Sequence, residues 1–252
     1  MKLSSITAVC AFLMVLTSTA NASPACSSAS GRDTLSLVEL YTSEGCDSCP
    51  PADRWLSTTF PADNATASVL AFHVDYWDRL GWKDRFASAD YTARQHASMR
   101  ASGGTFVYTP QVLVQGRDVD RAKRVAAVKA AGTQAARSTI SLEADDGLVR
   151  VRASVPDKAS RRNAAVWIAY TDSGLVSDVK AGENRGVQLH HDHVVRALYG
   201  PFAIDDAGEA SATVNVAAPK ERGRNAALVA FVQSRANGDV LQTLTMPVCK
   251  VL

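Results

Sequence analysis

The first half of the chain alternates short apolar runs with longer amphipathic stretches. The apolar runs over residues 34–41, 68–74 and 111–115 are typical of buried strands. Residues 84–101 and 119–136 place apolar side chains at helical spacing. A further helix is expected from Pro50 onward, because proline is tolerated in the first turn of a helix. The pattern predicts the order strand, helix, strand, helix, strand, helix.

After about residue 138 the pattern changes to strict alternation, which is typical of half-buried strands. Two alternating stretches flank Asp145-Asp146-Gly147, a turn sequence that predicts a hairpin. The expected strands cover residues 139–144, 148–155, 164–171, 189–198, 210–216, 226–233 and 241–248. About seven strands with turns rich in glycine and aspartate predict a β-sandwich of roughly 110 residues.

The first 22 residues have the features of a signal peptide. Lys2 precedes an apolar run over residues 6–16, and Ala20-Asn21-Ala22 is a small-x-small cleavage site. The run is too short for a membrane span, and no second run of spanning length follows. A lipoprotein would need cleavage before Cys26, which the residues preceding it fit poorly. We therefore expect cleavage after Ala22 and a soluble periplasmic or secreted protein without a membrane span.

Composition and charge exclude several classes of protein. The 252 residues are 46% hydrophobic and 21% charged, which is ordinary for a globular protein. Lys and Arg number 27 against 25 Asp and Glu, so no field of one sign exists to attract nucleic acid or anionic lipid. We expect no nucleic-acid partner.

The cysteines then become informative. Cys10 would leave with the signal peptide, and the even number that remains suggests pairing in an exported chain. Cys46 and Cys49 form a CxxC motif between the first expected strand and the first expected helix. If these two pair with each other, Cys26 and Cys249 are left, and we expect a structural disulfide between them because chain termini often lie close together.

The position of the CxxC motif at a helix start favours redox chemistry. The thiolate is the reactive form of cysteine, and the N–H groups of a first helical turn stabilise it. Cys46 is predicted to attack and Cys49 to resolve the mixed disulfide. Asp47 lies between them and disfavours a thiolate, which predicts a moderate reduction potential. Two alternatives remain: a metal site, for which the motif supplies two of four usual ligands, and a permanent structural disulfide.

A proline directly before the third expected strand is a second candidate feature. Pro110 follows Thr109, and a proline cannot donate a hydrogen bond to a central strand. The position after a helix and before a strand, with a CxxC motif upstream, resembles the place where thioredoxin-superfamily proteins hold a cis proline facing the motif. This resemblance implies a cis peptide bond here, with Thr109 and Pro110 positioning an extended substrate chain beside the sulfur atoms. The alternative is an ordinary trans turn proline.

Five segments together carry a resemblance to a known family: residues 38–51, 73–77, 81–84, 108–111 and 182–186, with Val194-Val195-Arg196 following them. The chain resembles the secreted thioredoxin-like proteins of domain-of-unknown-function family 1223. The resemblance covers nearly all of the mature chain. It implies a thioredoxin-like fold with a β-rich C-terminal extension, and it implies no substrate.

These observations predict an α/β fold, with a thioredoxin-like domain followed by a β-sandwich-like C-terminal domain. The expected boundaries are a signal peptide over residues 1–22, the thioredoxin-like domain over 33–137 and the sandwich over 138–249.

Glu39 and Trp77 are further candidates near the cysteines. Glu39 lies in the first expected strand and is predicted either to relay a proton to the resolving cysteine or to form an ion pair. Trp77, with Tyr76 and Trp82, follows the second strand, where ligand crevices of open α/β sheets lie. These aromatic residues either line a substrate groove or hold their loop on the protein.

The histidines are weaker candidates. His73 lies in an apolar strand and is expected to be a core residue with satisfied hydrogen bonds. On a strand His191 and His193 would share one face, where two imidazoles can bind a metal, but a solvated or interface strand is the simpler interpretation. The glycine-flanked turn over residues 182–186 either contacts the first half and orders its loops or holds only itself.

The predicted function is thiol–disulfide exchange, by an enzyme or enzyme-like exported protein, on protein or peptide thiols and disulfides. No cofactor and no metal is predicted. The alternatives are a binding or structural module with a clamp disulfide and a periplasmic metal carrier. An exposed Cys46 sulfur in a groove beside Pro110 would favour thiol–disulfide exchange. A buried Cys46 with an unreachable Cys49 would favour a clamp disulfide. A histidine nitrogen close to both sulfur atoms would favour a metal carrier. The substrate, the direction of exchange and the redox partner do not follow from the sequence.

Overall fold

The structure is a computed structural model that describes residues 26–249. The predicted signal peptide and the cut after Ala22 lie outside the described residues. The α-helices of residues 26–249 are α1 (Pro50–Thr59), α2 (Ala89–Ala101), α3 (Arg124–Ala131) and α4 (Lys158–Arg161). Short 3-10 helices are η1 (Asp78–Leu80) and η2 (Arg121–Lys123). No helix within this range is long and apolar enough to cross a membrane.

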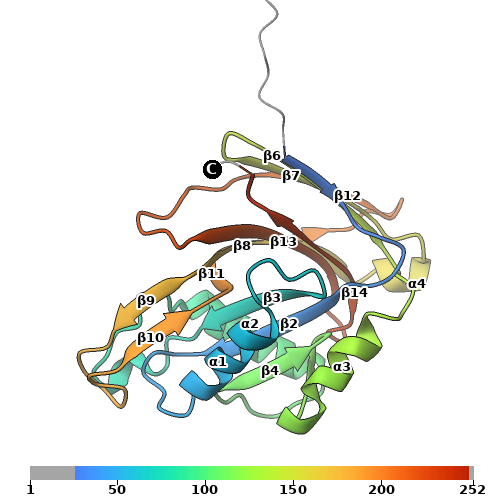
Figure 1. Cartoon of the computed structure of the whole chain (residues 1–252). Coiled ribbons are helices and arrows are strands. Elements are labelled where there is room, and N and C mark those ends of the chain that lie inside the picture. Colours follow the sequence, from blue (N-terminus) through green and yellow to red (C-terminus); the bar gives the residue numbers. More distant parts are fainter. Residues whose placement is uncertain (1–25, 250–252) are drawn as a thin grey trace, which may run out of the picture.

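A mixed sheet of eight strands forms the centre of the molecule (Figure 1). Its order is β14, β13, β8, β11, β3, β2, β4, β5. Strands β2 and β3 run parallel, and β4 lies antiparallel to β2. The strands are β2 (Ser36–Thr42), β3 (Ala67–His73), β4 (Gln111–Val114), β5 (Arg117–Asp118), β8 (Ala164–Ser173), β11 (Val194–Ala203), β13 (Asn225–Ser234) and β14 (Val240–Pro247).

A second, antiparallel sheet has the order β1, β6, β7, β12. Its strands are β1 (Cys26–Ala29), β6 (Thr139–Asp145), β7 (Leu148–Ser154) and β12 (Glu209–Asn215). Its apolar side chains pack against β8, β13 and β14 in one core that includes Leu142, Val151, Ile168, Leu228 and Leu244. The remaining two strands, β9 (Leu175–Asp178) and β10 (Gln188–His191), pair with each other.

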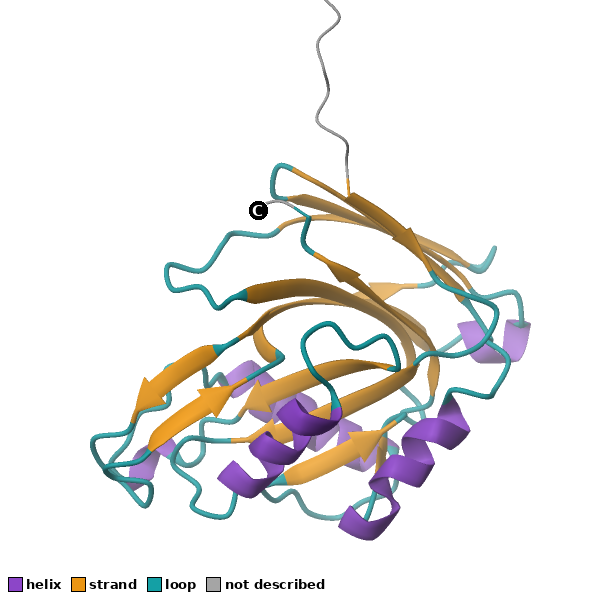
Figure 2. Ribbon diagram, in the orientation of Figure 1, coloured by secondary structure: helices purple, strands orange, loops and turns teal. Residues whose placement is uncertain are grey.

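The predicted fold class, an α/β thioredoxin-like domain followed by a separate β-sandwich, is wrong. Strand β11 of the second half pairs in parallel with β3 of the first half, through Val194 and Ala71, and antiparallel with β8. The large sheet is therefore continuous across the boundary expected after residue 137, and strands dominate the protein (Figure 2). The local pattern predicted most strands, but the periodicity of a strand does not specify its neighbours.

Two predicted helices are shorter than their amphipathic patterns. The helix expected over residues 84–101 begins at Ala89, because Ser88 caps it by accepting a hydrogen bond from the N–H of Asp90. The helix expected over 119–136 is confined to α3, and residues 117–118 form the edge strand β5.

The two faces of β2 belong to different cores. Leu40 packs in the cluster that contains Leu56 of α1, whereas Leu37 and Tyr41 pack with Met99 of α2. Because side chains alternate along a strand, odd-numbered residues of β2 face α2 and even-numbered residues face α1. The helix that follows the CxxC motif therefore lies on the even-numbered face.

The expected disulfide between Cys26 and Cys249 is confirmed, with its Cα atoms 5.9 Å apart. It joins the beginning of β1 to the residues after β14, so both ends of the described chain meet at one place. Disulfides persist in oxidising compartments, and this bond is compatible with a periplasmic or extracellular protein.

Candidate functional site

The Cys46–Cys49 disulfide closes the turn between β2 and α1, with Cα atoms 5.4 Å apart. The N–H of Cys49 donates to the carbonyl of Cys46, and Cys49 is the N-cap residue of α1. The local sequence explains this position, since Pro50 and Pro51 fit only the first turn of a helix.

The helix start offers the sulfur atoms fewer N–H groups than the sequence suggested. Pro50 and Pro51 have no N–H, and the N–H groups of Ala52 and Asp53 both donate to the carbonyl of Cys49. Stabilisation of a Cys46 thiolate would then depend on the helix dipole and on the Ser48 hydroxyl, which lies 3.4 Å from Cys46 Sγ, and it would be opposed by Asp47. We therefore expect a stable disulfide with a low reduction potential.

Cys46 and Cys49 are both completely buried, with 0% exposed surface. Part of their cover comes from residues 182–186, here called the cover loop. The Asn184 side-chain amide donates to the carbonyls of Glu44 and Cys46, both at 2.9 Å, and Glu183 accepts from the N–H of Asp47 at 3.1 Å. The glycine-flanked turn in the second half of the chain thus holds the CxxC turn, as one of the two sequence hypotheses stated.

Gly182 is required for this close approach. Its φ of +72° is one that L-residues rarely adopt, and a Cβ atom there would lie 3.1 Å from the Cβ of Trp82. The indole N–H of Trp82 donates to Glu44 at 2.7 Å. Trp82 therefore packs under the cover loop and does not line an open groove.

Trp77 lies between the turn before Cys46 and the loop that holds Thr109 and Pro110. The Thr109–Pro110 peptide bond is cis, as predicted. The Trp77 indole N–H donates to the Thr109 hydroxyl at 2.8 Å, and a Cβ on Gly45 would lie 3.1 Å from the Trp77 Cβ. Trp77 thus connects the turn before Cys46 with the loop before β4, and its side chain is partly exposed.

Glu39 is not brought to the cysteines. It lies on the odd-numbered face of β2, away from α1, and is completely buried. The Arg94 guanidinium donates to it at 2.8 Å and to Gln233 of β13 at 3.1 Å. The ion pair, which was the alternative to a proton relay, is the arrangement present.

A cluster of buried ionisable groups, which the sequence did not predict, lies next to the CxxC turn. His73 Nδ1 lies 2.7 Å from Asp84, which also accepts from the N–H of Glu44 at 2.9 Å. His191 Nε2 lies 3.2 Å from Glu44, and the rings of His73 and His191 are 5.0 Å apart. Asp53 of α1 accepts from the hydroxyl of Thr42. Polar residues in apolar surroundings, such as His73 in β3, were the available signal.

Burial and ion pairing set the charges of this cluster. Burial opposes the charge on His73, but the neighbouring Asp84 outweighs it and raises the pKa of His73. Burial likewise disfavours ionised Asp84 and Glu44, yet His73 and His191 respectively lower the pKa of each carboxyl. Burial raises the pKa of Asp53. The cluster therefore holds the His73–Asp84 ion pair, a close contact between His191 and Glu44, and an acid, Asp53, that resists ionisation.

The expected metal-binding face of His191 and His193 does not form. Strand β10 ends at His191, and His193 has a φ of +57° that breaks the strand expected over residues 189–198. His191 contacts Glu44, whereas His193 Nε2 lies 2.7 Å from the carbonyl of Phe60. Among residues 26–249, no three His, Cys, Asp or Glu side chains are placed to hold a metal ion. Nothing here supports the metal-carrier alternative.

Comparison with known proteins gives a family. The DUF1223 model, described as a protein of unknown function, matches residues 37–233, which is more than half of the chain. The chain belongs to the DUF1223 family. The resemblance drawn from the sequence is confirmed to this extent, while the thioredoxin-like character attached to it is not.

Two solved structures resemble this DUF1223 protein. A crystal structure of an Agrobacterium tumefaciens protein has a TM-score of 0.60 and 26% identity, covering 86% of this chain and 96% of that one. HBP35 of Porphyromonas gingivalis has a TM-score of 0.61 and 12% identity, covering 88% of this chain and 76% of that one. The second likeness shows the fold alone. No curated protein matches the chain.

The His73–Asp84 ion pair beside the CxxC turn predicts a pH dependence of stability. The raised pKa of His73 means that its contribution is complete below about pH 6.5, its ordinary value, and is lost as pH rises through the raised pKa. The lowered pKa of Asp84 means that its contribution is present above about pH 4 and is lost as pH falls. Wild type should therefore exceed His73→Gln in free energy of unfolding most clearly near about pH 5, and less at about pH 9.

Urea unfolding of both proteins across this pH range measures the difference directly. Taking the difference removes the titration of groups elsewhere, and Gln can still donate to Asp84. A difference that stays constant with pH would show that His73 is neutral in the folded protein.

The hydrogen bonds of the cover loop predict which substitution exposes the disulfide. Asn184→Ala removes two of the three bonds described above, so we expect reduction of Cys46–Cys49 by dithiothreitol to become roughly 30-fold faster, because each bond contributes about 1 kcal/mol. Alkylation of free thiols at timed intervals and mass spectrometry measure each disulfide separately. Arg185→Ala, an exposed neighbour in the same loop, is the matched control. Equal rates in the two variants would mean that the loop does not limit access.

Proposed function

We propose that this DUF1223 protein is exported and performs thiol–disulfide exchange through Cys46 and Cys49. The observation that carries the proposal is the position of the disulfide, which closes between a buried strand and a helix start under a cover from a distant segment. A disulfide that only fastened its own turn would not need a cover from a segment about 138 residues away along the chain.

The reaction starts from the disulfide. A substrate thiolate attacks Cys46 Sγ, the Cys46–Cys49 bond breaks, and Cys49 leaves as a thiolate that takes up a proton. A second substrate thiolate then attacks the substrate sulfur of the mixed disulfide, and Cys46 leaves. The substrate gains one disulfide and loses two electrons, which the protein holds as two thiols. The reverse sequence reduces a substrate disulfide and returns the protein to its oxidised form.

The cover loop must open before this reaction. Three hydrogen bonds at about 1 kcal/mol each correspond to an open population on the order of 1%. Such a population is enough for exchange on a timescale of seconds while the closed form shields the sulfur atoms from other thiols. Protein and peptide substrates fit this arrangement, because they can bind the exposed surface first and reach the sulfur atoms as the loop opens.

Thr109, Pro110 and Trp77 are the proposed substrate-binding residues. Their support is the chain of contacts from Gly45 through Trp77 to Thr109, which places them beside the turn that carries Cys46. Phe106, which is 69% exposed, and the half-exposed Tyr108 precede them and offer apolar surface to a polypeptide.

Trapping of a mixed disulfide tests the proposal. In Cys49→Ser the free Cys46 thiolate should attack a peptide whose cysteine is held in a disulfide with a small leaving thiol. The resulting mixed disulfide between Cys46 and the peptide should be stable, because no resolving thiol remains. Cys46→Ser should form none, since Cys46 is the proposed site of attack and Cys49 the resolving cysteine. Each variant is also made with Asn184→Ala, so that slow opening of the cover loop does not hide the reaction. Failure of every combination to exchange would overturn the proposal.

Complete burial of both sulfur atoms specifically favours a second candidate, a structural clamp. In that case the disulfide fixes the turn that binds Glu183 and Asn184, and it joins the two halves of the chain. A clamp predicts that both serine variants lose thermal stability to the same extent and that neither forms a mixed disulfide, even with the cover loop weakened. The trapping experiment therefore separates the two candidates.

A further inference from the structure

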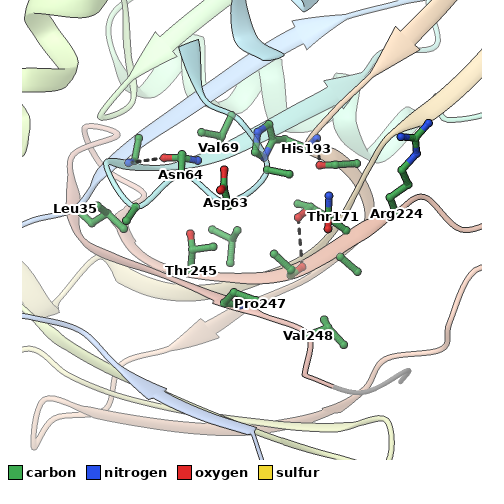
Figure 3. Close-up of a pocket in the computed structure, with 18 residues that line it drawn as sticks. Leu35, Asp63, Asn64, Val69, Thr171, His193, Arg224, Thr245, Pro247 and Val248 are labelled. Atoms are coloured by element: carbon green, nitrogen blue, oxygen red, sulfur yellow. Dashed lines mark hydrogen bonds between the residues drawn. The ribbon is translucent and has the colours of Figure 1, made fainter. Parts of the chain in front are cut away.

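A cavity of about 810 Å³, whose lining includes neither Cys46 nor Cys49, lies where the large sheet curls (Figure 3). Strand β14 returns toward β3, and the Ser68 and Thr245 hydroxyls meet at 2.7 Å. The loop after α1 covers the opening between them. The volume lies within the range of small-molecule sites, roughly 300–1,000 Å³.

Small apolar side chains form the walls of the cavity. They come from β3, β13 and β14 and include Ala67, Val69, Ala227, Val229 and Pro247. The polar groups between them are already engaged: the Thr171 hydroxyl donates to the carbonyl of Ala227, and the Ser173 hydroxyl accepts from the N–H of His193. The walls therefore fit an apolar body and demand few hydrogen bonds from it.

Arg224 lies at one edge of the cavity, and its backbone and aliphatic stem are held by contacts with neighbouring residues (Figure 3). Its N–H donates to the carbonyl of Ser173 at 2.7 Å, and its aliphatic stem packs where a Cβ on Gly174 would lie, 3.2 Å from the arginine Cγ. A side chain at position 174 would displace the stem. The guanidinium makes no ion pair or hydrogen bond with any other residue of the described chain.

Asp63, in the loop after α1, places a negative charge at the cavity. Figure 3 shows it well apart from Arg224. The loop is held from both ends. Asn64 accepts hydrogen bonds from the N–H groups of Thr66 and Ala67, and His193 contacts the carbonyl of Phe60. The Asp63 carboxylate, like Arg224, has no partner within residues 26–249.

We propose that this cavity binds short apolar peptides with free termini. The peptide carboxylate pairs with Arg224, the ammonium group pairs with Asp63, and small apolar side chains contact the walls. A ligand that carried only a carboxylate would pair with Arg224 but would repel the Asp63 carboxylate. A ligand that carried only an ammonium group would pair with Asp63 but would repel the Arg224 guanidinium. The separation of the two charges favours a peptide over a single amino acid. This site does not depend on the cysteine chemistry.

Calorimetric titration of the full mature protein with the tripeptide Ala-Leu-Ala tests the proposal. The free tripeptide should bind, and N-acetylation or C-terminal amidation should each weaken binding at least tenfold. Arg224→Gln should weaken binding of the free peptide and remove the effect of amidation, whereas Asp63→Asn should remove the effect of acetylation. Both residues are exposed, so these variants are expected to fold. Arg150→Gln changes an exposed arginine on β7, outside the cavity, and should bind as wild type does.

Three results with charged and capped ligands would overturn the proposal, and a fourth comes from a cavity-filling variant. The first is the absence of binding at millimolar tripeptide. The second is equal affinity for free and capped peptides. The third is binding of octanoate that strengthens in Asp63→Asn, which would assign the cavity to apolar carboxylates. Ala227→Phe fills the cavity without changing a charge, and unchanged peptide binding in this variant, with its fold verified by circular dichroism, would place the peptide elsewhere.

Discussion

Arg94→Ala is expected to lower the free energy of unfolding by roughly 3–5 kcal/mol, because it leaves the carboxylate of Glu39 buried without its partner. Glu39 has no exposed surface and Arg94 only 8%. The Arg94 guanidinium also contacts the faces of three aromatic rings. Its Cζ lies 5.4, 5.3 and 4.9 Å from the ring centroids of Phe72, Trp167 and Phe231. One side chain of α2 thus joins β2 of the first half to β8 and β13 of the second.

Urea unfolding monitored by tryptophan fluorescence and circular dichroism measures this loss. Arg100→Ala is the matched control, since Arg100 is exposed on the same helix, and it should change stability by at most about 0.5 kcal/mol. In a Glu39→Gln background the loss caused by Arg94→Ala should become smaller, because no charge is left behind. A loss below about 1 kcal/mol for Arg94→Ala would mean that water reaches Glu39 in the variant.

The ion pair also shows where prediction from the sequence stops. Glu39 stands in an apolar strand, and the sequence allowed either a relay to the cysteines or an ion pair. The choice depends on the face of β2 that it occupies and on Arg94, which lies 55 residues later. Only packing of α2 on the odd-numbered face decides between them.

The two disulfides were predicted correctly because their signals are local or arithmetic, and the cis proline because the resemblance to thioredoxin-superfamily proteins implied it. A CxxC motif closes a small ring, Pro110 stands next to its strand, and four cysteines leave one further pair. The fold class failed because it depends on β11 pairing with β3, a contact between residues more than 120 positions apart, such as Ala71 and Val194. The burial of Cys46 depends in the same way on Asn184, whose amide is 138 residues away along the chain.

Loss of the Cys26–Cys249 disulfide is expected to have the second large effect on the stability of the folded protein. Cys26→Ser with Cys249→Ser is expected to lower the free energy of unfolding by roughly 3–5 kcal/mol. The bond closes a loop with a sequence separation of 223 residues, so the reduced chain gains much more freedom when unfolded than it would after losing a short ring. The folded protein changes little, because β1 keeps its register with β6 from Cys26↔Ala144 to Ala29↔Ser141.

Chemical denaturation of the double variant and of wild type measures the loss. The matched comparison is Cys46→Ser with Cys49→Ser, whose ring has a sequence separation of 3 and should contribute only about 2 kcal/mol in the same chain-entropy account. If the two double variants lose equal stability, loop length is not the cause, and strain or packing in the folded state must account for the effect.

Mild reduction of wild type gives an independent route to the same state. Cys249 is exposed, whereas Cys46 and Cys49 are buried under the cover loop, so dithiothreitol should open the terminal disulfide first. Wild type at that stage should unfold at the urea concentration of the Cys26→Ser, Cys249→Ser variant while Cys46–Cys49 remains intact. Earlier reduction of Cys46–Cys49 would instead mean that the cover loop is open most of the time, and the disulfide used for exchange would then be the more accessible of the two.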